Sequence, residues 1–264
     1  MNLDDDAAQA RAIQAGERAC ASPDSSAGRA NSPGTRKLVL RLGGRVEDSP
    51  ASATPELERC LNRVEYYQPL YGITGFEDPL RCCRDRALAI EAALGAVDQP
   101  LRLVDFGSSL GYFPFFFADR GAIATGFDIK AANTAVALAT QRLNGLPATF
   151  GTAPLDFETV REIPRGTYDV ALILSVLHHI THQRGIPYVE QLLAELLSRI
   201  PTLVLELAHR NEDVPYAWRN ALPEDPLAIL RACGEAQVRL LGHFPSHLSA
   251  ATRPMYLVTR QARG

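Results

Sequence analysis

A glycine-rich turn with an acid beside it is the strongest chemical signal in the sequence. The segment VDFGSSLGYF covers residues 104–113, with Asp105 ahead of Gly107 and a helix expected directly after Gly111. Glycine is needed where a backbone bends sharply and where a ligand approaches the main chain closely. Ser109 stands where a nucleotide-binding turn usually has a third glycine, so the turn alone is weak evidence for a ligand.

A second acid ends the next expected strand. The segment GFDIK places Asp128 there, with Ile129 after it. An acid at this position can accept hydrogen bonds from both hydroxyls of a ribose. Asp105 would repel a pyrophosphate but suits a ligand with an ammonium group. The two acids therefore predict S-adenosylmethionine as the cofactor and argue against NAD; the alternative is a structural turn with two solvated acids.

Three histidines crowd the segment after the fourth expected strand. His178, His179 and His182 lie within five residues, where open α/β sheets place their ligands. Imidazole titrates near neutral pH, so one of them is a candidate general base for a hydroxyl acceptor. A metal site is disfavoured because no Cys, Asp or Glu shares the segment, and a structural role for any single histidine stays open. We expect the cluster to form the catalytic, acceptor-facing part of the site, with Ser175 on the cofactor side.

Alternating strands and helices must position these groups. Apolar runs predict strands at 101–106, 122–129, 148–151, 168–176, 202–208, 237–242 and 255–259. Helical patterns at 112–120, 131–145 and 186–200 separate several of them. Such alternation predicts an α/β fold with a doubly wound, mostly parallel seven-stranded sheet, whose last two strands form an antiparallel pair at one edge. Helical patterns from Pro55 and over about 80–96 form an N-terminal helical extension.

Composition bounds the domain organisation and the class of protein. With 264 residues, 46 % hydrophobic and 22 % charged, the chain suits one domain with appendages. Residues 1–54 have too few large apolar groups for a core and are expected to be a disordered or weakly structured tail, ahead of the domain at 55–264. A net charge of −3 argues against general nucleic-acid binding.

Cellular location is also bounded by the sequence. Five cysteines without metal-ligand spacing fit a reducing cytoplasm. An acidic N-terminus and the lack of about 18 consecutive apolar residues predict neither a secretory signal nor a membrane span.

The motifs together resemble those of class I S-adenosylmethionine-dependent methyltransferases. Further segments are similar, over about 60–260, to the methyltransferase domain of the bifunctional kinase–methyltransferases that terminate bacterial O-antigen chains. These segments are EYYQPLYG, the helix with Arg81, Cys83 and Arg86, LELAHRNE, LPEDP, FPSHLS and RPMYLVT. The resemblance implies methyl transfer to the non-reducing terminus of a glycan, on a sugar hydroxyl or a terminal phosphate.

The same resemblance has limits that shape the expected partners. The 264 residues hold no counterpart of the kinase domain or of the long coiled coil of that family. A separate kinase or glycosyltransferase is therefore a candidate partner beside the glycan acceptor. Other acceptors stay open, namely a small metabolite, a natural product or an RNA terminal phosphate, as does a non-catalytic cofactor-binding subunit.

Residues outside the turn complete the predicted site. We expect Tyr67, Gln68, Ser108 and Arg81 on the cofactor side, where Arg81 would meet the cofactor carboxylate as a charge-assisted pair. Arg253 could hold an anionic acceptor by a bidentate contact. The substrate side is expected to comprise Glu206, His209, His247 and Arg253. Each assignment has an alternative. Tyr67 and Gln68 could form a packed aromatic helix end, Arg81 could lie on a solvated helix face, and Arg253 could form a surface ion pair.

Overall fold

The computed structural model describes residues 52–74, 82–95, 99–246 and 250–261. All of them belong to one compact unit, Pro50–Gly264. The expected tail before residue 52 and two predicted site residues, Arg81 and His247, lie outside the described residues.

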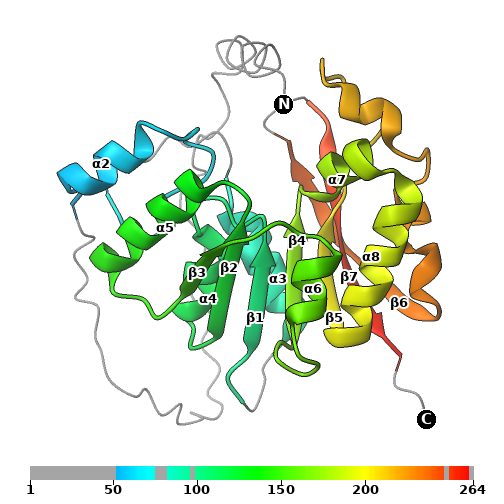
Figure 1. Ribbon diagram of the computed structural model, residues 1–264, viewed down its shortest axis with the longest axis horizontal. Helices are drawn as coiled ribbons and strands as arrows, with labels where there is room; N and C mark the ends of the chain where they lie inside the picture. The colour runs from blue at the N-terminus through cyan, green and yellow to red at the C-terminus, as the bar shows by residue number, and fades with distance from the viewer. Residues whose placement is uncertain (1–51, 75–81, 96–98, 247–249, 262–264) are drawn as a thin grey trace, which may run out of the picture. The chain divides into compact units, whose positions relative to one another are not determined.

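One seven-stranded sheet organises the described chain, in the order β3-β2-β1-β4-β5-β7-β6 (Figure 1). Strands β1 to β5 are parallel, β7 is antiparallel to β5, and β6 is antiparallel to β7. This confirms the predicted mostly parallel seven-stranded sheet with an antiparallel pair at one edge. The strands are β1 (Arg102–Phe106), β2 (Ile123–Asp128), β3 (Thr149–Thr152), β4 (Val170–Leu174), β5 (Thr202–Glu206), β6 (Ala236–Pro245) and β7 (Thr252–Arg260).

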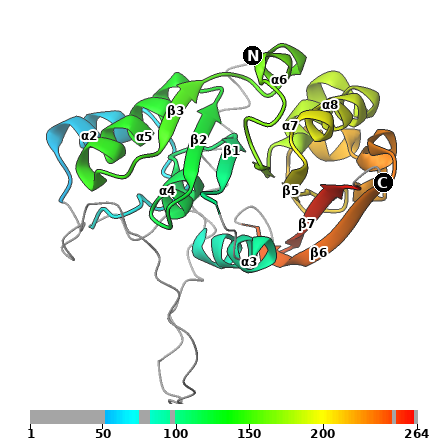
Figure 2. The ribbon, with the colours of Figure 1, turned by 90° about the horizontal axis from the view of Figure 1, so that it is seen from below.

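Helices cover both faces of this sheet (Figure 2). Successive residues of one strand face opposite sides: Leu103 of β1 packs with α3 and α4, whereas Val104 packs with α8. The helices are α2 (Pro55–Leu61), α3 (Arg84–Leu94), α4 (Tyr112–Ala118), α5 (Ala131–Asn144), α6 (Phe157–Glu162), α7 (Leu177–Arg184), α8 (Ile186–Arg199) and two 3₁₀ helices, η2 (Ala217–Ala221) and η3 (Pro226–Cys233). In the described part of the chain, no helix is long and apolar enough to cross a bilayer.

The histidine segment is a helix, which its sequence pattern did not indicate. Residues 177–184 form α7, and Gly185, with φ +85°, separates it from α8. The segment is too polar for a helical apolar stripe, so its order comes from packing. Leu177, His178 and Thr181 are the residues that α7 buries.

The carboxyl ends of the parallel strands meet at one edge, where the strand order reverses between β1 and β4. After β1 the chain adds β2 and β3 on one side, and it then crosses to begin β4 on the other side. Open α/β sheets bind ligands in the crevice at such a switch point. The glycine turn after β1 and the histidine helix after β4 therefore leave the sheet side by side.

Candidate functional site

The glycine loop after β1 is tight enough to require glycine at two positions. Gly107 has φ +79° and Gly111 has φ +89°. A Cβ atom on Gly107 would lie 2.4 Å from Val176 Cγ2, and one on Gly111 would lie 2.8 Å from Phe150 Cε1. Both distances are far below ordinary carbon contacts. The backbone amides of Gly107 and Ser108 donate to the carbonyl of Phe127, which fastens the loop to β2.

Asp128 holds the loop from the end of β2. Its carboxylate accepts from the Ser109 amide at 2.9 Å, the Lys130 amide at 2.8 Å and Asn133 Nδ2 at 3.2 Å. Loss of solvation raises the pKa of this buried carboxyl, and the hydrogen bonds oppose that rise. A carboxylate has about four acceptor positions, so about one remains for a ligand. Ile129 next to it leaves 70 % of its side chain exposed, an apolar surface beside a polar anchor.

The other predicted cofactor residues surround the same loop. Asp105 is buried in β1 between Gly126 of β2 and Leu172 of β4. Ser108 is buried against Gly126, with its Oγ 2.8 Å from the position of a Cβ there. Gln68 Oε1 accepts from the Tyr112 amide at 3.4 Å, so the segment ahead of α3 reaches the start of α4. Tyr67, one residue earlier, is half-buried.

The three histidines of α7 take different environments. The His178 ring is buried against His179 and Trp218, with centroid separations of 4.0 and 4.5 Å. His179 is exposed to solvent at its surface and packs its ring against His178. Desolvation, followed by the charges of Arg253, Lys130 and His182, lowers the pKa of His179 to about 4. His179 is therefore neutral near pH 7, and His182 is exposed.

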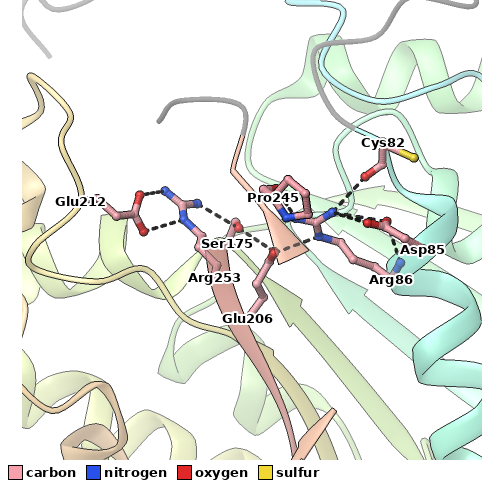
Figure 3. Close-up of polar contacts among 8 residues, drawn as sticks. All are labelled: Cys82, Asp85, Arg86, Ser175, Glu206, Glu212, Pro245 and Arg253. Carbon is pink, nitrogen blue, oxygen red and sulfur yellow. Dashed lines mark hydrogen bonds and ion pairs between the residues drawn. The ribbon is translucent and has the colours of Figure 1, made fainter. Parts of the chain in front are cut away.

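A buried network of charged groups joins the ends of β4, β5 and β7 to α3 (Figure 3). Arg253 donates from Nε and Nη2 to the two carboxylate oxygens of Glu212, at 2.8 and 2.7 Å, and from Nη1 to Ser175 Oγ at 3.1 Å. Ser175 Oγ donates to Glu206 Oε2 at 2.7 Å, and Arg86 Nε donates to Glu206 Oε1 at 2.9 Å. Arg86 makes further contacts with Asp85 and with the carbonyls of Cys82 and Pro245.

This network changes how two predicted substrate residues are understood. The paired edge of Arg253 is taken by Glu212, so an anionic acceptor would have to displace Glu212 to gain the same two-point contact. Glu206, 1 % exposed, has the partners that its burial demands. Arg86 and Glu212 were not among the predicted site residues. The signal for Arg86 was the acid inside the apolar run of β5, which called for a partner from another part of the chain, whereas no local pattern indicated Glu212.

The chain after β5, residues 208–222, forms a cap that lies beside the histidine helix. His209 donates its amide to Glu212 Oε1 at 3.0 Å, and burial lowers the pKa of its imidazole. Trp218 is buried with Ala208 and its neighbours, which makes it an anchor of the cap. The half-buried ring of Tyr216 stacks on Trp218 at 6.4 Å and is the accessible aromatic that sequence reasoning missed.

Comparisons with known proteins agree with this geometry. A family model described as a methyltransferase domain matches residues 104–198. Two Escherichia coli proteins named O-antigen chain terminator bifunctional methyltransferase/kinase WbdD are 34 % identical over 213 residues, covering 78 % of this chain and 29 % of theirs. The chain thus spans less than a third of the length of these curated relatives.

Solved structures show the same likeness. A structure of the bifunctional kinase–methyltransferase WbdD is 33 % identical, with a TM-score of 0.70, over 77 % of this chain and 46 % of that chain. The Synechocystis PCC 6803 magnesium protoporphyrin IX methyltransferase, determined with bound SAH, shares the fold at 20 % identity, with a TM-score of 0.50 over 67 % of this chain and 81 % of that chain.

Proposed function

Because the chain belongs to the class I S-adenosylmethionine-dependent methyltransferases, we propose that it methylates an oxygen atom at the non-reducing terminus of a surface glycan of the O-antigen type. The glycan part rests on the 34 % identity to proteins named as O-antigen chain terminators. The observation that carries the active-site assignment is the contact between Val176, at the start of the histidine helix, and Gly107 of the glycine loop. Donor-side and acceptor-side groups thereby share one crevice.

The residues of the glycine loop fit the cofactor. When bound, S-adenosylmethionine supplies a methyl group on a positively charged sulfur. In our assignment Asp128 accepts from the ribose, and the exposed face of Ile129 packs on the adenine. Asp105 is the expected partner of the ammonium group. Gln68 and Tyr67 are expected to cover the cofactor on the side of the glycine loop. Arg81 stays the predicted partner of the cofactor carboxylate.

The acceptor side is assigned to the histidine helix and the cap. His179 is neutral near pH 7, so it is able to accept a proton from a hydroxyl, although a pKa of about 4 makes it a weak base. A phosphate acceptor is already anionic and needs cations to orient it, and the charges of Lys130 and Arg253 both act on His179. Tyr216 offers an aromatic face to a sugar ring. The proposal therefore covers both a hydroxyl oxygen and a phosphate oxygen as the acceptor. We place the reaction in the cytoplasm, beside a partner glycosyltransferase or kinase.

Mass spectrometry of the lipopolysaccharide from a deletion strain tests the proposed acceptor. We expect the terminal methyl group to disappear and to return when the gene is restored. A glycan terminus that keeps its methyl group in the deletion strain would refute the capping role and favour a small-metabolite acceptor.

A second measurement separates the two acceptor oxygens. Glycan extracted from the deletion strain is offered to the purified protein with methyl-labelled cofactor, before and after phosphatase treatment. Phosphatase should abolish labelling if the acceptor is a terminal phosphate and leave it unchanged if the acceptor is a hydroxyl. For a hydroxyl, His179→Gln should also lower turnover while the affinity for S-adenosylhomocysteine stays the same.

A further inference from the structure

Four charged side chains are removed from water beside the proposed acceptor site. Arg86, Glu206, Glu212 and Arg253 are each at most 3 % exposed. Two cations and two anions cancel, which limits the cost of their burial. They come from α3, the end of β5, the cap and the start of β7. Glu206 and Arg253 meet at one hydroxyl, that of Ser175, while Arg86 binds Glu206 and Glu212 binds Arg253 (Figure 3).

Ser175 has a backbone conformation that a serine rarely adopts. Its φ is +59°, and in the described part of the chain only Ser109 shares a positive φ among non-glycine residues. Such a conformation persists when the surroundings fix it, and it is frequent at functional sites. Here the Ser175 hydroxyl is held between Glu206 and Arg253, and the Ser175 amide donates to the Glu206 carbonyl at 3.3 Å.

The next residue transmits this constraint to the cofactor loop. Val176 follows Ser175 and presents Cγ2 to Gly107, 2.4 Å from the position that a Cβ would take there. The hydroxyl of Ser175 donates its proton to Glu206 and has no second proton to donate to a ligand. Ser175 therefore acts on the crevice through the position that it gives to the main chain. The contacts thus run without a gap from Glu212 in the cap, through Arg253, Ser175 and Val176, to Gly107.

We infer that Ser175 is a positioning residue, whose hydroxyl, held by the buried Glu212–Arg253 and Arg86–Glu206 pairs, fixes the turn after β4 against the cofactor loop and so couples the acceptor-side cap to cofactor binding. The inference rests on the proposed function in one respect, that the cofactor binds at the Gly107 loop. It assigns to Arg86 and Glu212 an effect on a ligand that they do not touch.

The test measures S-adenosylhomocysteine affinity by calorimetry together with the unfolding midpoint. Ser175→Gly accepts the positive φ without strain and removes the CH2OH side chain with its two hydrogen bonds, so it should fold and bind the ligand roughly ten-fold more weakly, a usual size for coupling between contacting residues. Ser175→Asn, which tolerates the same φ and carries both a donor and an acceptor, should recover part of the affinity.

A double-mutant cycle shows whether the cap acts through Ser175. Glu212→Gln should weaken binding of S-adenosylhomocysteine, and the Ser175→Gly/Glu212→Gln double variant should bind no more weakly than Ser175→Gly alone. If Glu212→Gln fails to fold, Arg253→Lys, which keeps the charge but loses the paired contact, takes its place. Glu195→Gln, which breaks the Glu195–Arg199 pair on α8, is the matched control and should change nothing.

Each outcome has one meaning. Wild-type affinity in Ser175→Gly, or additive losses in the cycle, would overturn the inference while leaving the proposed function intact. A wild-type protein that does not bind S-adenosylhomocysteine would instead refute the proposed cofactor site.

Discussion

Replacing Gly107 by alanine tests the geometry of the crevice directly. The change has two costs that the structure separates. A positive φ of +79° costs an alanine about 1–2 kcal/mol. The new Cβ would also lie 2.4 Å from Val176 Cγ2, more than about 1 Å closer than carbon atoms normally approach. Overpacking of this kind costs about 1–3 kcal/mol, so we expect a loss of about 2–5 kcal/mol in the free energy of unfolding.

A matched glycine isolates the steric part of this loss. Gly166 has nearly the same φ, +77°, but a Cβ there meets nothing within 4 Å. Gly166→Ala should therefore cost only the conformational part, about 1–2 kcal/mol. Urea unfolding of both variants measures the difference, and calorimetry with S-adenosylhomocysteine should show weakened binding for Gly107→Ala alone.

A second substitution shows which contact is responsible. Val176→Ala in the Gly107→Ala background removes Cγ2 and should restore part of the stability. Equal losses for Gly107→Ala and Gly166→Ala, or no recovery in the double variant, would refute the close contact between the loop and the histidine helix.

Three further predictions concern the cofactor, pH and the tail. Asp128→Ala should weaken S-adenosylhomocysteine binding by about 1.5–3 kcal/mol in calorimetry, the usual value of hydrogen bonds to a charged group; unchanged affinity would contradict the assignment. Because the folded pKa of His179 is lowered from 6.5 to about 4, the unfolded chain binds more protons in that interval. The free energy of unfolding should therefore fall as pH drops from about 6.5 to about 4. His179→Gln should make the free energy of unfolding, measured at several pH values, depend less on pH in this interval. Deletion of residues 1–36 should leave the melting temperature and the ligand affinity nearly unchanged, since their composition cannot build a core; a large loss of either would show that the tail contributes to the domain.

The sequence could indicate a candidate cofactor half of the site because its signals are local. The glycine turn, Asp105 and Asp128 each lie at a strand end that apolar runs already mark. Positive φ at Gly107 and Gly111 follows from the same short segment. The predicted ends of the strands therefore indicated both the fold and the sheet edge at which the crevice lies.

The proposed acceptor half was less predictable because its ion pairs join distant segments. Arg86 and Glu206 are 120 residues apart, and Arg253 and Glu212 are 41 residues apart. An acid inside the apolar run of β5 called for a partner, but its position in the sequence did not indicate which residue supplies it. The position of β7 between β5 and β6 decides these pairs, and no local pattern encodes that strand order.

The order in which the strands are synthesised has a consequence for the assembly of the enzyme on the ribosome. β7 is made after β6 but lies inside it, next to β5. Until Arg253 has been synthesised, β5 keeps an open edge, and Glu212 lacks its cation. At ordinary translation rates this interval lasts a few seconds. Carboxylates at an open strand edge discourage pairing with other chains. Glu206, at the end of β5, thus leaves a charge at this open edge during synthesis, and the contacts of Arg253 with Glu212 and Ser175 form only when β7 docks.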